Sequence, residues 1–379
     1  MPIKIVKVET RSQMRKFVSF PIDDLYKDNP YFVPSLVIDE IGTLNTKKNP
    51  AFDFCERELF LAYRDKKIVG RIAAIINHRA NEVWNQKYAR FGFVDFIDDK
   101  EVVDALFDTA ENWARQKGME HIVGPMGFTD LDHEGLLVEG FDRISTMSTT
   151  YSYPYYQTQI ERRGFQKEID WVEFRIPVPE QVPERHQRIA KLVADKYGLT
   201  LLKFKNLRQI TPYVDKLFHQ LNVAYAPLFG FTPLTKRQID YYVKMYVPLL
   251  QWDLVSIIVK IDTDEVIGFG IGVPSLSYAL QKSKGRLFPT GWIHLLKGLK
   301  GKGKGNKVVD LLLMGVAPEY QGKGVNAMIF ADFIPSAHRS GFRFAESNPE
   351  LEINNKIQAQ WDGFNAENHK RRRAYKLKL

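Results

Sequence analysis

The pattern of apolar and polar positions divides the chain into two halves that carry similar elements. In the first half, an apolar run at 59–63 leads through a polar stretch into a second run that ends at Gly70. In the second half, a run at 255–259 leads through a polar stretch into a run that ends at Gly268. Apolar, β-branched runs on both sides of a polar turn are typical of β-hairpins. We therefore expect one hairpin in each half.

The spacing of equivalent positions indicates an internal duplication. Gly70 and Gly268 are 198 residues apart, and Gly164 and Gly363, each followed by phenylalanine, are 199 apart. Near-equal offsets at distant points favour duplication over chance. Each half then reads strand, strand, strand, helix, strand, helix, strand, with one or two helices in front. This order predicts an α/β fold with a mixed, partly parallel sheet.

A proline-rich stretch separates the two halves. Three prolines in 177–183 exclude a helix or a central strand there. The length of 379 residues allows two domains, and 44% hydrophobic residues exclude a disordered chain. We therefore predict domains at 1–180 and 185–379.

Cysteine content and hydropathy limit the possible locations. Cys55 is the only cysteine, so the chain has no internal disulfide and no zinc site built from cysteines, and a buried bystander thiol is expected. The first residues are too charged for a signal peptide, and no stretch of about 18 apolar residues predicts a membrane span. The expected location is the cytoplasm.

The positive charge is concentrated in two stretches. The formal net charge is +9, yet 282–307 holds eight basic residues without an acid, and 369–379 holds six. The rest of the chain is therefore acidic, and the two basic stretches indicate anionic ligands or surfaces. In the tail, Tyr375, Leu377 and Leu379 alternate with lysines, which favours a final half-buried strand over nucleic-acid binding.

The segment 308–330 carries the most specific pattern in the chain. An apolar strand leads through a short turn into Gln321-Gly322-Lys323-Gly324, which opens an apolar helix. Glycines let backbone N–H groups converge, and a helix N-terminus adds partial positive charge. Such a loop is suited to hold a pyrophosphate, with Lys323 at its rim.

This segment resembles the phosphate loop of the GNAT superfamily of acyl-CoA-dependent N-acyltransferases. That loop reads Gln/Arg-x-x-Gly-x-Gly/Ala after Val-x-Pro, and here Val316-Ala317-Pro318 precedes it, with Asn326 in place of the last small residue. The resemblance implies an acyl-CoA N-acyltransferase fold and acetyl-CoA or a longer acyl-CoA as co-substrate. It implies these cofactor contacts: Met314, Gly315 and Val316 along the pantetheine arm, and Gln321, Gly322, Lys323, Gly324, Val325, Asn326 and Ala327 around the pyrophosphate. Asn354, in a polar stretch near the same site, is a further candidate for a cofactor contact, or it is ordinary loop polarity.

The first half has the same layout but a different loop. A helix is expected at 101–117, and Asp98, Asp99 and Glu101 stand at its start without any glycine. Carboxylates there would repel a pyrophosphate, so we expect a GNAT-like domain that does not bind coenzyme A. The segments 124–142 and 154–165 are also similar to bacterial tandem GNAT proteins, some of which N-acylate sphingoid bases.

Two carboxylates are candidates for the chemistry. In GNAT acetyltransferases a base lies six residues before the valine of Val-x-Pro, which by resemblance is Asp310; strand periodicity places it on one face with Leu312, Met314 and Val316. The alternative is a solvated residue at a strand end. Glu346, after the expected fifth strand, is the second candidate. The usual acid, a tyrosine, is replaced by Ala359, which leaves Tyr320 or water.

Two further patterns complete the set of expectations. Within 286–304, an apolar helical face flanked by lysines is predicted, either for an anionic membrane or for packing on the first half; its members are Phe288, Trp292, Leu295, Leu296 and Leu299. His133 stands between two acids without a second spaced histidine, which favours a polar loop, so no metal is expected.

We therefore predict an acyl-CoA-dependent N-acyltransferase whose acceptor is a small-molecule or lipid amine. The alternatives are a non-catalytic acyl-CoA-binding or scaffold protein, favoured by the missing tyrosine, and a membrane-peripheral long-chain N-acyltransferase that acts on a lipid amine. The sequence leaves the acceptor, the acyl length and the oligomeric state open.

Overall fold

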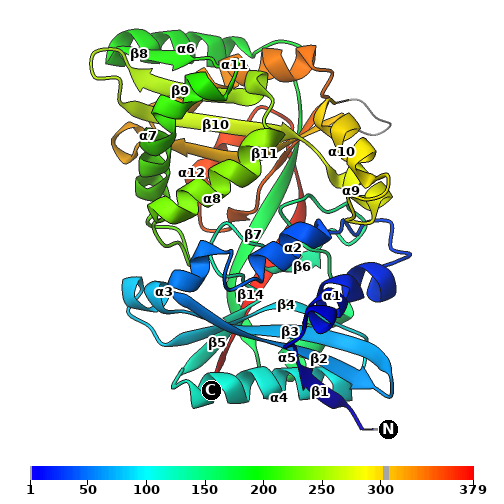
Figure 1. Ribbon diagram of the computed structural model, residues 1–379. Coiled ribbons are helices and arrows are strands. Elements are labelled where there is room, and N and C mark those ends of the chain that lie inside the picture. Colours follow the sequence, from blue (N-terminus) through cyan, green and yellow to red (C-terminus); the bar gives the residue numbers. More distant parts are fainter. Residues whose placement is uncertain (1, 302–306) are drawn as a thin grey trace. The chain divides into compact units, whose positions relative to one another are not determined.

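The computed structural model describes residues 2–301 and 307–379 (Figure 1). Its longer strands, in chain order, are β2 (Cys55–Arg64), β3 (Lys67–Asn77), β4 (Tyr88–Phe96), β7 (Gln166–Pro177), β9 (Val255–Lys260), β10 (Val266–Pro274), β11 (Val308–Val316) and β14 (Glu367–Lys378). The short strands are β1 (Lys4–Lys7), β5 (His121–Gly124), β6 (Leu136–Glu139), β8 (Leu199–Leu202), β12 (Phe344–Ser347) and β13 (Glu350–Leu351). The helices are α1 (Arg11–Phe20), α2 (Val37–Thr43), α3 (His78–Val83), α4 (Lys100–Gln116), α5 (Tyr155–Arg162), α6 (Glu184–Tyr197), α7 (Leu207–Tyr225), α8 (Lys236–Tyr246), α9 (Ser277–Ser283), α10 (Gly291–Leu299), α11 (Asn326–Arg339) and α12 (Asn355–Gln358). The predicted mixed α/β class is confirmed.

Contacts group the described chain into two compact units. Unit 1 holds the residues up to Val172 together with Ala279–His294 and His369–Leu379, and unit 2 holds Glu173–Tyr278 and Leu295–Asn368. The segment Ala279–His294 and the C-terminal strand thus contact the first half, although the sequence analysis assigned both to the second. The two domains 1–180 and 185–379 stay a prediction.

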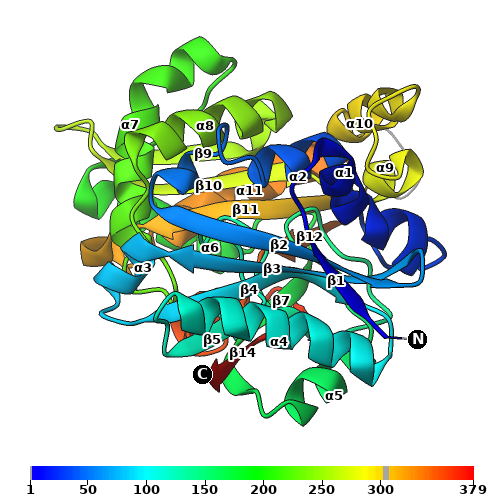
Figure 2. The same ribbon diagram turned by 60° about the horizontal axis from the view of Figure 1, so that its bottom comes forward.

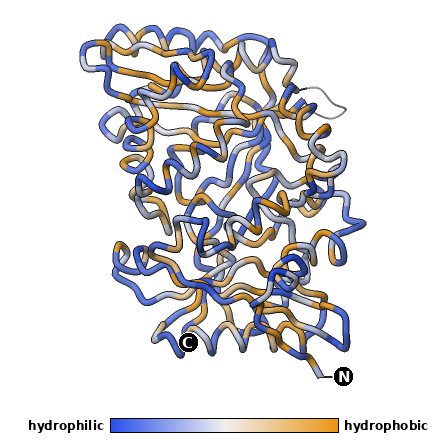
Figure 3. Tube along the Cα trace, viewed as in Figure 1, coloured by the Kyte–Doolittle hydropathy of each residue, from blue (hydrophilic) through white to orange (hydrophobic). Residues whose placement is uncertain are grey.

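Unit 1 is built on strands in the order β1-β2-β3-β4-β5-β14. The predicted hairpin is β2 and β3, and β4 runs parallel to β5. Figure 2 shows α4 lying along one face of these strands. Hydrophilic and hydrophobic positions both occur along α4 (Figure 3), and its apolar stripe, Val102, Val103, Leu106 and Ala110, is buried against the sheet. The predicted helix is therefore confirmed, with Asp99 as its N-cap.

Unit 2 is built on strands in the order β7-β12-β11-β10-β9-β8. The second predicted hairpin is β9 and β10, and β11 runs parallel to β12. Helix α11 packs against α6 and β9, while α7 contacts β10 and β11. The helix continues through Pro335 to Arg339, so the proline does not shorten it. This unit contains the strand, loop and helix that the sequence analysis singled out.

In each unit the strand beside the parallel pair comes from the other half of the sequence. In unit 1, β14 from the C-terminus pairs with β5 through Tyr375–Lys378. In unit 2, the end of β7 pairs with β12, with Arg175 opposite Glu346 and Pro177 opposite Phe344. The basic tail is thus a strand, as its alternation predicted, and Asp170 accepts hydrogen bonds from Arg371 and Arg373. The two halves therefore exchange their last strands.

Candidate functional site

A β-bulge in β11 sets the orientation of the side chains at the centre of unit 2. Leu313 pairs with Ile271 of β10, while Leu311 pairs with the next residue, Gly272, so Leu312 is the extra residue. A bulge reverses the alternation of side chains beyond it. Met314 therefore packs with Val309 and Leu311 on the α11 face. The expectation that Asp310 shares a face with Met314 and Val316 was wrong, because strict alternation does not extend across the bulge.

Beyond the bulge, β11 separates from β12. The parallel pairing runs from Val308 to Leu311 and ends there, so among the described residues no strand pairs with the edge 312–316 on that side. Residues 311–316 are only partly buried although their strand is central. Two side chains reach this edge: the Asn348 amide donates to the Leu312 carbonyl (2.6 Å), and the Tyr225 hydroxyl donates to the Met314 carbonyl (3.0 Å). An open strand edge of this kind can pair with the amides of an extended ligand.

The predicted phosphate loop follows this edge directly. A short 3-10 turn, Pro318–Tyr320, leads into the turn 321–325, and α11 begins at Asn326. Gly322 has φ +72° and Gly324 φ +87°, values that explain why glycine occupies both positions. Asn326 is the first helical residue and not the cap, since Val325 holds the N-cap position.

The loop presents a concave set of backbone donors. The N–H groups of Gln321, Lys323 and Ala327 close the turn by donating to carbonyl groups within it. In the described part of the chain, the N–H groups of Gly322, Gly324, Val325 and Asn326 donate to no protein acceptor. Four open donors at the N-terminus of a 14-residue helix fit an anion such as a pyrophosphate.

Three polar side chains that the sequence predicted as cofactor contacts lie in different places: one ties the loop to β11, one lies at the loop rim, and one caps another helix. The Gln321 amide donates to the Val316 carbonyl (3.2 Å) and ties the loop to the end of β11. Lys323 is exposed, and its ammonium group lies 5.5 Å from the ring centres of both Tyr197 and Tyr320. These rings keep the cation at the loop rim. Asn354 caps α12, where its side chain accepts from the Ile357 N–H, so the structure gives it a local role.

The two predicted carboxylates lie side by side. Asp310 of β11 and Glu346 of β12 are register partners in the parallel pair, and they are 1% and 6% exposed. Partners in adjacent strands point to the same face, so both project away from the face of Leu311 and Ala345. Burial at the centre of the sheet removes the alternative of a solvated Asp310. Two acids at the level where the strands separate are placed to handle a proton beside a ligand on that edge.

A hydroxyl that the sequence analysis missed lies on the same edge. The position expected for the acidic tyrosine, Ala359, is exposed and lies in the 3-10 turn Ala359–Trp361. Tyr225, at the end of α7, instead brings a phenol to Met314. Because α7 is nearly 90 residues from β11 in the sequence, no local pattern could have signalled this contact.

Comparisons with known proteins identify the family. No family model matches the chain. Bacterial ceramide synthase from Caulobacter vibrioides is 31% identical over 323 residues, which cover 84% of this chain and 82% of that protein. The chain belongs to the bacterial ceramide synthase family. Protein YghO from Escherichia coli is 29% identical over 374 residues, which cover 97% of this chain and 94% of that protein.

Solved structures identify the fold of this family member. A tandem GNAT protein from the clavulanic acid biosynthesis pathway superposes with a TM-score of 0.58 at 12% identity and covers 99% of this chain and 98% of its own. A glucosamine N-acetyltransferase region of a fungal β-N-acetylglucosaminidase superposes with a TM-score of 0.57 at 14% identity, over 99% of this chain and 38% of that one. The predicted tandem GNAT fold is confirmed.

In the first half, a carboxylate occupies the N–H groups at the start of the corresponding helix, α4. Asp99 accepts from the N–H groups of Glu101 (3.0 Å) and Val102 (3.3 Å) at the start of α4. Arg64 donates to Asp99 (2.6 Å) and holds the pKa of that carboxyl below its usual value, so it stays anionic. The donors that would receive a phosphate are thus occupied by a permanent negative charge.

The strand edge is also closed in the first half. Past the parallel pair of β4 and β5, the Met126 N–H donates to the Phe91 carbonyl (2.9 Å). A Cβ atom on Gly92 would lie 2.2 Å from the Met126 carbonyl oxygen. The backbone at Met126 therefore packs directly against β4. This geometry supports the expectation that only the second half of the family member holds coenzyme A.

The segment after α9 has two different sides. In α10, Gly291, Leu295 and Gly298 are buried, whereas Trp292 is 45% and Leu296 47% exposed, and Phe288 just before it is 78% exposed. In unit 1, Gln281 donates to the carbonyls of Pro30 and Phe32 and Arg286 pairs with Asp23, so part of the segment packs on the first half. The packing on the first half is thus observed for part of the segment, and Leu295 of the expected apolar face is buried. Contact of the exposed side chains with a membrane stays a prediction. Lys302 and Lys304, which the same expectation included, lie outside the described residues.

Two smaller expectations concern unit 1. Cys55 is buried, and burial raises the pKa of its thiol to about 12, as suits a bystander. His133 contacts the Met147 carbonyl (3.2 Å), and burial raises the pKa of neighbouring Asp130 to about 7 against the opposing charge of Arg90. Among the described residues, no group of three or more metal-ligating side chains could hold a metal ion.

Proposed function

We propose that the chain is an acyl-CoA-dependent N-acyltransferase that binds its co-substrate in unit 2. The observation that carries this proposal is the continuous arrangement of an open β11 edge, four open N–H donors and two buried carboxylates. The family relationship supports an acyl-transfer activity of some kind. The donor set fits a pyrophosphate, and the edge 312–316 fits an amide-bearing pantetheine arm.

In this proposal, three side chains and the backbone of β11 have different roles in acyl transfer. Bound acyl-CoA would supply a thioester, whose C–S bond breaks as the amine nitrogen forms the new C–N bond and free coenzyme A leaves as the thiol. Asp310 accepts the proton that the amine loses, and Glu346 adds negative charge at the same level, which attracts a cationic amine. The Tyr225 hydroxyl is placed to donate a proton to the leaving sulfur. The backbone of Met314, Gly315 and Val316 orients the pantetheine arm.

The acceptor in this proposal is a long-chain lipid amine. One relative is named a bacterial ceramide synthase, and ceramide synthesis joins an acyl group to the amino group of a sphingoid base. The smaller alternative, a soluble amine, fits the same carboxylates but does not account for the exposed apolar side chains before and within α10.

Calorimetric titration with acetyl-CoA and a long-chain acyl-CoA, followed by an assay of thiol release with a long-chain amine, tests the proposal. We expect one binding site per chain and thiol release that depends on the amine. Binding without release under any amine would favour the non-catalytic acyl-CoA-binding protein. No binding of either acyl-CoA would contradict the proposed function.

We also propose that the segment 288–297 docks on an anionic membrane surface from the cytoplasm. Phe288, Trp292 and Leu296 are exposed on one side, and Lys297 and Lys300 stand beside them. Exposed tryptophan and leucine with adjacent lysines form the pattern of an interfacial helix, and the lysines complement anionic headgroups. Among the described residues, no helix is long and apolar enough to cross a membrane.

Replacing Phe288 and Trp292 together with serine is expected to weaken binding to vesicles that contain phosphatidylglycerol by at least 10-fold, because both side chains lose apolar area in the bilayer. Vesicle co-sedimentation measures this change. Ile353→Ser is the matched control, since Ile353 is 68% exposed and lies outside the segment. Equal binding of the double variant and the control would contradict membrane docking.

A further inference from the structure

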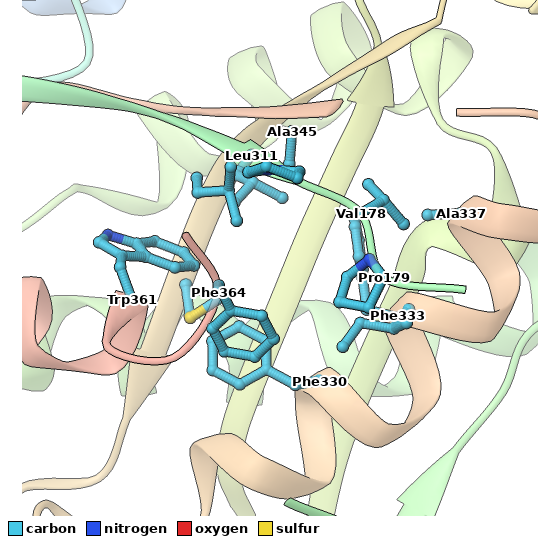
Figure 4. Close-up of a pocket in the computed structure, with 13 residues that line it drawn as sticks. Val178, Pro179, Leu311, Phe330, Phe333, Ala337, Ala345, Trp361 and Phe364 are labelled. Carbon is cyan, nitrogen blue, oxygen red and sulfur yellow. The ribbon is translucent and has the colours of Figure 1, made fainter. Parts of the chain in front are cut away.

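A pocket in unit 2 is lined by apolar side chains alone. The space between these side chains is about 440 Å³, a volume that includes space open to solvent, and the cavity proper is about 40 Å³. Figure 4 shows Leu311 and Ala345 on one side, Phe330 and Phe333 of α11 opposite, and the rings of Trp361 and Phe364 at one end. Val178 and Pro179, which follow β7, form another wall.

The pocket adjoins the open edge of β11. Leu311 and Met314, which line the pocket, stand on either side of the bulge residue Leu312. They therefore lie where β11 separates from β12. Helix α11 starts at the phosphate loop and then passes along the pocket through Phe330 and Phe333. One strand and one helix thus connect the pyrophosphate donors with the apolar pocket.

The sheet keeps the acids out of this pocket. Asp310 and Glu346 follow Val309 and Ala345 in their strands, and strand alternation turns them to the opposite face from Leu311 and Ala345. The apolar face is suited to hydrocarbon, while the acidic face is suited to a cationic amine.

The aromatic end of the pocket is held by a partly buried acid, Glu350. The Trp361 indole N–H donates to the Glu350 carboxyl (2.9 Å). Burial raises the pKa of Glu350 to about 8, so the carboxyl is mainly neutral at pH 7. A neutral partner fixes the indole ring without placing a charge beside the apolar wall.

We propose that this pocket receives the methylenes next to the thioester of a medium- or long-chain acyl-CoA, and so selects the acyl chain. The proposal rests on the proposed function, because it needs coenzyme A at the phosphate loop. A buried methylene contributes about 0.8 kcal/mol in water-to-apolar transfer, which is about a 4-fold gain in affinity for each methylene seated.

The experiment compares the affinities of coenzyme A, acetyl-CoA and octanoyl-CoA for the full chain and for two filled variants. Ala345→Phe fills the pocket from β12, and Val178→Trp fills it from the partly exposed opposite wall, so the second variant decides if the first does not fold. Ala366→Phe is the matched control, because Ala366 packs against the same apolar cluster but does not line the pocket.

We expect the unmodified chain to bind octanoyl-CoA at least 10-fold more tightly than acetyl-CoA. In the filled variants we expect this preference to fall below about 3-fold, while the affinity for coenzyme A itself and the behaviour of Ala366→Phe stay unchanged. The acyl pocket is wrong if the unmodified chain binds coenzyme A but does not prefer octanoyl-CoA over acetyl-CoA. It is also wrong if a folded filled variant keeps that preference. In both cases the proposed function stands. If coenzyme A does not bind at all, both proposals fail.

Discussion

Replacing Gly322 with aspartate is expected to reduce the affinity for coenzyme A by at least 100-fold, whereas asparagine at the same position reduces it by less than 10-fold. Gly322 has φ +72°, and a Cβ atom there would meet no other atom within 4 Å. Asn and Asp both tolerate this backbone region and have nearly the same size. The two variants therefore differ mainly by one negative charge among the open N–H donors. A 100-fold loss corresponds to about 2.7 kcal/mol, within the range for like charges in a partly desolvated site.

Calorimetric titration of both variants measures this effect, and thermal unfolding of each confirms that the fold is kept. Gly322 is a better position than Gly324 for the test, because a Cβ atom on Gly324 would lie 2.7 Å from Ile189 and disturb the packing of α6. Equal affinities for Gly322→Asp and Gly322→Asn would show that no phosphate binds at this loop.

Replacing Asp310 with asparagine is expected to lower amine-dependent turnover by about 10² to 10⁴-fold without changing the affinity for acyl-CoA. The substitution keeps the shape of the side chain but removes the group that accepts the proton. Because Asp310 points away from the face that carries Met314, the apolar contacts of β11 are kept. The thiol-release assay and the titration together separate the chemical step from binding.

The matched control is Asp332→Asn on α11, where Asp332 binds Lys203 and Ser256 and lies outside the carboxylate pair. Its turnover should stay within about 3-fold of the unmodified chain. Full activity of Asp310→Asn, together with loss of activity in Glu346→Gln, would show that Glu346 is the base in place of Asp310. Full activity of both variants would show that neither carboxylate takes part in the reaction.

Local signals in the sequence were sufficient for the elements that position the site. The two hairpins, the helix that begins after Asp99 and the strand, loop and helix around Gly322 each depend on residues close in the chain. Turn residues, caps and apolar periodicity act over these short distances. Asp310 and Glu346 were each singled out from their own segment, but their pairing depends on the register of β11 with β12.

Features that depend on distant pairing could not be predicted. The bulge at Leu312 becomes visible only when β10 is aligned with β11, and it reverses the faces expected for Met314 and Val316. The Tyr225 hydroxyl and the Asn348 amide reach β11 from separate elements, and neither residue type is unusual in its own segment. The sequence therefore indicated the loop and its two acids, but not the groups that complete the edge.

Because of the exchange of last strands, each half of the sequence contributes a strand to the sheet of the other half. Pro177, which ends the strand that the first half contributes to unit 2, lines the apolar pocket together with the next two residues, Val178 and Pro179. A cut in the proline-rich stretch would leave each fragment without one strand of its own sheet and would open the pocket. Under the proposed function, the first half therefore does not bind coenzyme A itself but supplies one wall of the pocket beside the coenzyme A site of the second half.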